Sequence, residues 1–333
     1  METNLTPLGI DAGNGAFKLY GASGGLEFVS QAASNGTQKV LSTLGLRKSK
    51  APLAIHNENG SFYVGAGSHD FGRPVENLDV DRFNGTPEMK ALLHGSLTRY
   101  QQRYGKFSTP LAVVVGLPNE VLTGELAEQN VENVKRWLRG THTWTADGEP
   151  YSVEIAYVKA ASQVTGGLFD YLLDAEGNFI PERKGAFNSE VGIITIGFGT
   201  VELMVVRNRE IVQRFTSGSA SGVRRLLELV NGQRLYSLGE MDMQLRAGQL
   251  DTREALPIWE REVTGVIEKQ WGTAWKRFAS VLIMGGGAIL LKESLPHRFN
   301  GRAYLPDEPV QAIARGLYRL TLLQQTRKAR NFA

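Results

Sequence analysis

Two glycine-rich segments contain the residue types that could bind an anionic ligand. The segments Asp11-Ala-Gly-Asn-Gly-Ala-Phe-Lys-Leu19 and Thr195-Ile-Gly-Phe-Gly-Thr-Val-Glu-Leu203 lie 184 residues apart, with both glycines and the final leucine in register. Each lies between an apolar stretch and an alternating one, which predicts a β-hairpin with a glycine-rich tip. Glycine at a tip permits positive φ and lets backbone N–H groups point at an anion. Two tips that close on one ligand would form a polyphosphate clamp.

Other glycine motifs for phosphate are absent from the sequence. There is no G-x-x-x-x-G-K-[ST] segment, so a P-loop enzyme is excluded. Neither Gly13 with Gly15 nor Gly197 with Gly199 completes G-x-G-x-x-G, which argues against a dinucleotide fold. A single G-x-G turn is usually an ordinary tight hairpin. The evidence for a phosphate site is therefore the pairing of two such turns at half-chain spacing.

The elements that must position the two tips follow an α/β pattern. Continuous apolar runs predict buried strands at Leu111–Val115, Val191–Ile196 and Val281–Met284, and alternation predicts a strand at Tyr151–Tyr157. After Val191–Ile196, a second strand is expected at Val201–Val206 and a third at Ile211–Phe215. Helices are expected over Pro87–Tyr104, from an Asn119 cap to Arg139, and over Ser162–Leu173, Ser219–Asn231, Leu238–Arg246, Arg253–Phe278 and Pro309–Lys328, the last with Asp307 as its cap. The repeat then predicts two related α/β halves that face each other across a cleft.

Composition fits a globular chain of about two domains. Of the 333 residues, 42% are hydrophobic and 21% are charged, which argues against wholesale disorder. The absence of cysteine excludes disulfides, thiolate zinc sites and a cysteine nucleophile. Five scattered histidines show no paired metal-binding spacing.

The charge pattern gives no footprint for direct DNA binding. The net charge of the chain is +3. Basic residues are densest in three segments, each typical of a solvated helix end or loop: Arg47-Lys48-Ser49-Lys50, Arg224-Arg225 and Arg327-Lys328-Ala329-Arg330. The first ten residues lack the pattern of a signal peptide, and there is no run of 18 apolar residues for a membrane span. A cytoplasmic protein is expected.

Three motifs in order resemble those of the actin, Hsp70 and sugar-kinase superfamily. Ile10-Asp-Ala-Gly-Asn-Gly-Ala-Phe-Lys18, Ile196-Gly-Phe-Gly-Thr200 and Ile283-Met-Gly-Gly-Gly287 are similar to its phosphate-1, phosphate-2 and adenosine motifs. The chain most resembles the ParM/StbA-like bacterial and archaeal actins, through Val115-Gly-Leu-Pro118, the stretch from Asp81-Arg-Phe to Ala91-Leu-Leu93, and Gln311-Ala-Ile-Ala-Arg-Gly-Leu-Tyr318. The resemblance covers nearly the whole chain. It implies an actin-like α/β fold with a nucleotide cleft between domain I, residues 1–160 with the helix 309–328 packed back on it, and domain II, residues 161–308.

The resemblance also implies roles for individual residues toward ATP (or GTP) and Mg²⁺. Asp11 would hold Mg²⁺ through water, and Gln163 would orient the attacking water, so these two are the expected catalytic residues. The other nucleotide contacts would come from Asn14, Gly15 and Lys18 at the β- and γ-phosphates, from Gly197, Gly199 and Thr200 in the opposing cradle, and from Gly285, Gly286 and Gly287 beside the adenosine. From local sequence alone, Lys18 is more typical of a solvated strand lysine, and Gln163 is equally typical of a surface helix start.

Thr195 departs from the family pattern. The phosphate-2 motif normally opens with Asp at this position, two residues before its first glycine. A threonine can hydrogen-bond to metal-bound water but supplies no charge to offset the cation. The substitution predicts weak Mg²⁺ retention or slow hydrolysis, with nucleotide binding kept.

The resemblance implies a nucleotide-driven filament protein. Actin-like chains assemble head to tail, a heterologous contact that generates helical filaments. ATP would favour the filament and hydrolysis would weaken it, in plasmid or DNA segregation through an adaptor protein or in a bacterial cytoskeleton. One alternative is a non-polymerising small-molecule kinase, which would need a general base that no motif places here. A chaperone-type ATPase is a third interpretation, but no second substrate domain follows the nucleotide fold.

Overall fold

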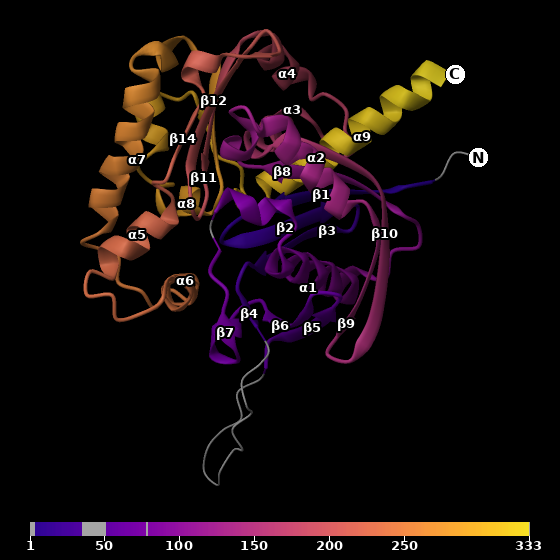
Figure 1. Ribbon diagram of the computed structural model, residues 1–333. Coiled ribbons are helices and arrows are strands. Elements are labelled where there is room, and N and C mark those ends of the chain that lie inside the picture. Colours follow the sequence, from indigo (N-terminus) through magenta and orange to yellow (C-terminus); the bar gives the residue numbers. More distant parts are fainter. Residues whose placement is uncertain (1–3, 35–50, 78, 333) are drawn as a thin grey trace.

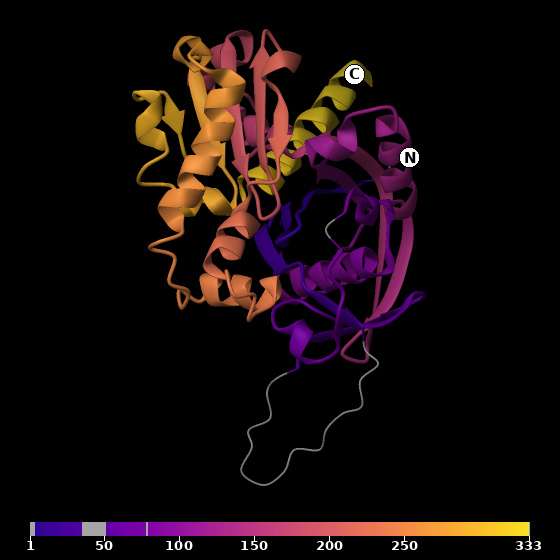
Figure 2. The same cartoon turned by 60° about the vertical axis from the view of Figure 1, so that its left-hand side comes forward.

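The protein is divided into two lobes, each built on its own β-sheet (Figure 1). The computed structural model describes residues 4–34, 51–77 and 79–332, with side chains to residue 326. The basic segment Arg47–Lys50 and the basic side chains of residues 327–330 lie outside the described part. Figure 2 shows the two lobes from a second direction, with the C-terminal helix running up behind their junction.

The first sheet contains, within the described residues, ten strands in the order β3-β2-β1-β8-β10-β9-β5-β6-β4-β7. The predicted glycine hairpin is formed by antiparallel β1 and β2, and β8 lies parallel to both β1 and β10. The strands are β1 (Thr6–Ala12), β2 (Ala16–Gly21), β3 (Gly24–Val29), β4 (Ala32–Ser34), β5 (Leu53–Asn57), β6 (Gly60–Val64), β7 (Arg73–Pro74), β8 (Leu111–Leu117), β9 (Gly140–Ala146) and β10 (Glu149–Ser162). Every residue of β8 is buried, as its apolar run predicted.

Helices α1 and α2 pack on this sheet, and the second of them begins later than predicted. Helix α1 (Pro87–Tyr104) has the predicted bounds and buries most of its residues. Helix α2 (Ala127–Leu138) does not begin at Asn119, so the predicted cap is wrong. Asn119 instead opens the 3₁₀ turn η3 (Asn119–Leu122), because its backbone N–H and side chain bond to residues outside the turn.

The second sheet has the order β13-β12-β11-β15-β16 among the described residues, with β14 paired to β12. Its strands are β11 (Glu190–Ile196), β12 (Val201–Arg207), β13 (Glu210–Ile211), β14 (Ser217–Ser219), β15 (Ser280–Met284) and β16 (Ala303–Tyr304). The helices around it are α4 (Pro181–Lys184), α5 (Val223–Val230), α6 (Leu238–Arg246), α7 (Leu256–Trp271) and α8 (Gly286–Leu290). The predicted strand Ile211–Phe215 is mostly a 3₁₀ turn, and α7 ends well before Phe278 because Gly272 takes positive φ (49°).

Two crossing helices connect the lobes. Helix α3 (Gln163–Leu172) packs on the second sheet, and helix α9 (Ala312–Phe332) packs on both α3 and β1. Asp170 of α3 is buried and accepts hydrogen bonds from Arg315 (Nε–Oδ1 2.6 Å) and Arg319 (Nη1–Oδ1 3.0 Å) of α9. Helix α9 begins at Ala312, so the predicted start at Pro309 and cap at Asp307 are wrong: a turn precedes the helix.

The helices approach closely because glycines face each other at the crossing. A Cβ at Gly316 of α9 would collide with the carbonyl oxygen of Gly166 in α3 and lie 2.6 Å from the backbone N of Asp170. Backbone atoms cannot move aside as a flexible side chain can. The division between residues 160 and 161 remains our proposal for the domain boundary; it falls near the end of β10, just before α3.

We expect Gly316→Ala to destabilise the protein by about 1–3 kcal/mol, the usual cost of overpacking a close contact. Gly265→Ala is the matched control, because Gly265 also lies inside a helix and a Cβ there would meet no atom within 4 Å. The control should be neutral or more stable by about 0.5–1 kcal/mol, since alanine favours helix. Urea unfolding followed by circular dichroism measures both. Equal effects of the two substitutions would contradict the close crossing.

Candidate functional site

The two predicted glycine hairpins are present, and their tips meet. In the first, Asp11 lies opposite Lys18 across β1 and β2; in the second, Thr195 lies opposite Glu202 across β11 and β12. The two tips come from different lobes. They approach so closely that the Phe198 side chain lies against the backbone of Gly15.

The tip glycines are needed for space rather than for backbone conformation. Among the described residues, positive φ occurs at other glycines but at none of the four in the tips, which corrects the expectation from the sequence. A Cβ at Gly15 would lie 2.6 Å from the Phe198 Cβ, and one at Gly199 would lie 2.8 Å from Asn14 Nδ2. A Cβ at Gly197 would make only an ordinary contact, 3.4 Å from the Thr200 oxygen. A side chain at Gly15 would force the tips apart, and one at Gly199 would displace the end of the Asn14 side chain.

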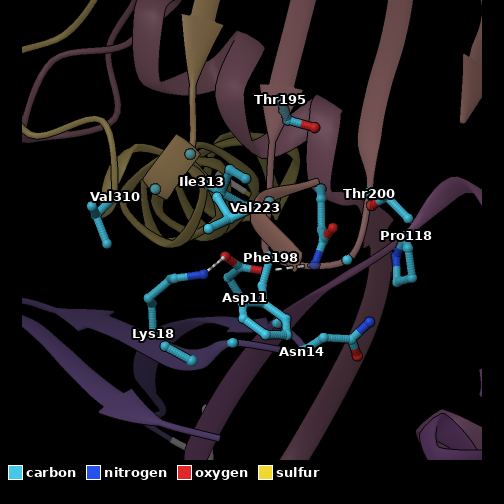
Figure 3. A pocket seen from close by; sticks show the side chains of 18 of the residues that line it. Asp11, Asn14, Lys18, Pro118, Thr195, Phe198, Thr200, Val223, Val310 and Ile313 are labelled. Atoms are coloured by element: carbon cyan, nitrogen blue, oxygen red, sulfur yellow. Dashed lines mark hydrogen bonds and ion pairs between the residues drawn. The ribbon is translucent and has the colours of Figure 1, made fainter. Parts of the chain in front are cut away.

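A cavity of about 460 Å³ lies between the tips (Figure 3). Most of the predicted site residues line it: Asp11, Asn14, Gly15, Lys18, Gln163, Gly197, Gly199, Thr200, Gly285 and Gly286. Gly287 does not line it. A Cβ there would collide with the side chain of Ile196, so Gly287 instead lets α8 pack against β11.

The buried carboxylate of Asp11 lies at the centre of this arrangement. Asp11 is only 1% exposed. Its Oδ2 is 3.0 Å from the ammonium of Lys18, and its Oδ1 accepts a hydrogen bond of 2.7 Å from Nε2 of Gln163. Gln163 is the first residue of α3, whose start is fixed by the Ser162 hydroxyl accepting from the backbone N of Val164 (3.2 Å). The carboxylate of Asp11 thus binds Gln163, which lies 152 positions away along the chain.

A buried arginine supports the first tip, and no sequence motif had indicated this role. Arg82 is 2% exposed and donates from Nη1 to Asn14 Oδ1 at 2.7 Å. Burial lowers the pKa of Arg82 to about 10, which leaves the guanidinium charged at neutral pH. Arg82 lies in the Asp81-Arg-Phe segment, but nothing in its spacing pointed toward Asn14.

Contacts across the mouth of the cleft join α6 of the second lobe to the first lobe. Arg246 pairs with Glu27 on β3 (Nη1–Oε1 2.5 Å) and with Asp242 on its own helix (Nε–Oδ2 2.8 Å). Gln31 Nε2 donates to the backbone oxygen of Gly239 at 2.9 Å. The partners from the two lobes lie more than 200 residues apart along the chain, so local pattern could not reveal them.

A second buried carboxylate lies behind the cavity wall. Glu202 is 2% exposed, and its Oε1 accepts a hydrogen bond of 2.8 Å from the backbone N of Asn119. Its Oε2 is buried without a hydrogen-bond partner in the described part of the chain, as is Nδ2 of Asn119. Burial raises the pKa of Glu202 to about 8, and the nearby carboxylates of Asp11 and Glu120 act in the same direction.

Comparison with known proteins agrees with this architecture. Residues 9–166 match the family model described as the N-terminal domain of actin-like proteins. Residues 9–166 thus resemble the N-terminal domain of actin-like proteins, and the whole chain has the actin-like fold. No curated protein sequence matches the chain.

Solved structures similar to this actin-like chain cover nearly its full length. The apo psk41 ParM protein is 16% identical, with a TM-score of 0.72 over 97% of this chain and 99% of that one. The actin-like protein Alp7A is 13% identical, with a TM-score of 0.74 over 97% of each chain. A ParM filament structure from Clostridium botulinum is 20% identical, with a TM-score of 0.70 over 96% and 99%. These likenesses confirm the predicted fold.

Two kinds of feature are absent from the described residues. No helix among them is both long and apolar enough to cross a membrane. Nor does this part of the actin-like chain bring together three or more His, Cys, Asp or Glu side chains in a group that could hold a metal ion.

The raised pKa of Glu202 predicts a pH-dependent stability. Between about pH 4.5 and pH 8 the unfolded chain releases this proton and the folded chain retains it, so the wild type loses stability as pH rises. The amide introduced by Glu202→Gln has no proton to lose. We expect this variant to be close to wild type near pH 4.5 and more stable by up to about 4 kcal/mol at pH 8.

Urea unfolding across this pH range, in EDTA and without nucleotide, tests the expectation. Glu154→Gln is the matched control, because it makes the same change at an exposed glutamate that does not line the cavity, so the difference caused by Glu202 should be absent from it. A difference between Glu202→Gln and wild type that stays constant with pH would contradict the raised pKa.

Proposed function

We propose that this chain is an ATP-dependent actin-like filament protein that hydrolyses ATP. We further propose a cytoplasmic role in plasmid or DNA segregation, or as a bacterial cytoskeletal filament. The observation that carries the proposal is the meeting of two glycine tips from two lobes around one cavity, with Asp11, Lys18 and Gln163 joined inside it. When a ligand contacts both tips, the separation of the lobes depends on the chemical state of that ligand.

The cavity fits a nucleotide in size and in chemistry. Its volume of about 460 Å³ is within the range of small-molecule sites. The close approach at Gly15 and Gly199 leaves backbone groups rather than side chains to face phosphates. Lys18 supplies a positive charge, and the apolar side chains of Val223 and Leu290, which line the cavity together with Gly285, suit a purine base. ATP and GTP both fit this description.

The donor set also fits Mg²⁺. This ion usually keeps several waters and binds through one or two carboxylates plus substrate phosphates, so a cage of protein ligands is not required. Asp11 is the carboxylate placed to hold such a water. When bound, Mg²⁺ would neutralise charge on the β- and γ-phosphates. Thr195 supplies no charge, so we propose that Mg²⁺ is held weakly or that ATP is hydrolysed slowly unless a carboxylate from another position takes its place.

Gln163 has the properties of a residue that positions the attacking water. Its amide is held against Asp11 at 2.7 Å, and it begins a helix whose first turn is capped. A glutamine can orient water by hydrogen bonds without acting as a strong base, which suffices for phosphoryl transfer to water. We therefore assign Gln163 to water positioning and Asp11 to the metal-bound water.

Self-assembly is the remaining part of the proposal. The similar Clostridium botulinum structure is a ParM filament, and another similar structure is described as an Alp12 filament. A head-to-tail contact of this kind is heterologous and continues into a helical polymer. We propose an adaptor protein as the link to DNA, because the net charge of +3 is too small for a direct footprint.

Gly15→Ala is expected to weaken nucleotide binding by about tenfold, because its Cβ would push Phe198 and the opposing tip away from the phosphates. Gly197→Ala is the matched control: it adds the same methyl group to a tip, yet makes only an ordinary contact. Isothermal titration with ATP and with GTP measures both and decides the base preference. Equal affinities of the two variants would contradict the role given to the close approach.

We expect ATP, more than ADP or no nucleotide, to yield a polymer that pellets and scatters light. Gln163→Ala should reduce phosphate release by about 100-fold, in the range for loss of a positioned catalytic group, while ATP affinity changes little. Its polymer should consequently last longer. Sedimentation, light scattering, phosphate release and negative-stain microscopy test this. Absence of polymer under every condition, together with phosphate transfer to a sugar, would overturn the proposal in favour of a small-molecule kinase.

A further inference from the structure

The two hairpins place their carboxylates on opposite strands. In the internal repeat Thr195 corresponds to Asp11, and Glu202 corresponds to Lys18. Both pairs face each other directly across their hairpins. The second hairpin therefore lacks an acid on its first strand but has one at the paired position of its second strand.

Thr195 and Glu202 share the face of the second sheet that packs on α3. On this face, Ile193 of β11 and Met204 of β12 pack against α3, and alternation along the strands brings Thr195 and Glu202 to the same side. Directly opposite residues of an antiparallel pair have Cβ atoms about 4.5–5.5 Å apart. A glutamate at 202 can thus reach the region that an acid at position 195 would occupy.

The Glu202 carboxylate adjoins the cavity wall. Its hydrogen bond goes to the backbone N of Asn119, and the residues on either side, Pro118 and Glu120, line the cavity, as does Thr195. In Figure 3, Pro118 and Lys18 lie on opposite sides of Asp11. The Asp11 carboxylate is near enough to affect the ionisation of Glu202.

One oxygen of this carboxylate is unused. Burying a polar atom without a hydrogen bond is costly, so an unpartnered oxygen in a buried carboxylate points to a missing partner. Oε2 of Glu202 is such an atom within the described residues. A water molecule of a hydrated cation would satisfy it, and the cation would favour the charged carboxylate.

We propose that Glu202 reaches across the hairpin from Thr195 and holds a water molecule of the hydrated Mg²⁺, supplying the carboxylate that Thr195 lacks. Asp11 and Glu202 then flank the metal from the two lobes. This inference rests on the proposed nucleotide function. It differs from a purely structural role for Glu202, in which the carboxylate only fixes Asn119 and η3.

The test separates metal retention from nucleotide binding. ATP affinity is measured in Mg²⁺ and in EDTA, and Mn²⁺ affinity of the nucleotide complex is measured by electron paramagnetic resonance. The proteins are wild type, Glu202→Gln, the control Glu154→Gln, and the double variant Thr195→Asp/Glu202→Gln, which moves the acid back to the first strand. Glu154 is exposed and does not line the cavity. Thermal unfolding verifies that each is folded.

We expect Glu202→Gln to weaken Mn²⁺ binding, and to reduce the gain in ATP affinity from Mg²⁺, by about tenfold, as for loss of a group that supports a metal indirectly. Its ATP affinity in EDTA should stay within about twofold of wild type. The double variant should recover most of the loss, and Glu154→Gln should match wild type.

Each other outcome has a definite meaning. If Mg²⁺ raises the ATP affinity of Glu202→Gln as much as that of wild type, the metal role is overturned. If Glu202→Gln loses ATP affinity equally in Mg²⁺ and in EDTA, the metal role is also overturned and Glu202 has a structural role. If Glu202→Gln does not fold, the double variant decides, and a folded double variant without a Mg²⁺ effect overturns the inference. Wild-type protein that binds no ATP under either condition refutes the proposed function itself.

Discussion

Asp11 places a nearly fully buried carboxylate between the two lobes, where an unpaired charge would cost several kcal/mol. The position is tenable because Lys18 offsets the charge and Gln163 satisfies the second oxygen. These partners come from the strand that follows the tip and from the helix that connects the lobes. The same contacts that allow the charge to be buried thus fix the start of α3 against the first hairpin, and the rest of the cleft depends on this junction.

Helix α3 carries that constraint into the second lobe. One of its faces packs on the second sheet, its Gly166 contacts α9, and Asp170 holds Arg315 and Arg319 of α9. Backbone-to-backbone packing leaves little freedom to slide. A ligand between the tips makes contacts with both lobes, so it favours the lobe separation in which those contacts are best. In the proposed function, this gives a physical route from the state of the bound nucleotide to the shape that a neighbouring subunit would contact.

The sequence predicted features whose causes are local. Alternating strands with glycine tips, the buried run in β8, and the bounds of α1 and α6 follow from periodicity and capping. The prediction failed where residues distant in the sequence determine the local structure. Asn119 is an excellent helix cap by type, but its backbone N–H is taken by Glu202 from the other lobe. The pairing of Arg82 with Asn14 and of Arg246 with Glu27 depends on distant parts of the chain, which no local pattern specifies.

The tip glycines show a subtler failure of the same kind. Their equal spacing in the two halves of the chain was correctly linked to two equivalent hairpins, but the physical reason was wrong: each of the crowded positions excludes a Cβ because of its neighbours and not because of its φ. Equivalent hairpins also explain how their chemistry could diverge. Cross-strand positions present side chains to the same side at short separation, so a charge can move from one strand to the other without altering the backbone. Asp11 with Lys18 and Thr195 with Glu202 occupy the same pair of directly opposite positions in the two hairpins. The repeat preserves this pair of positions more than the residue types found there.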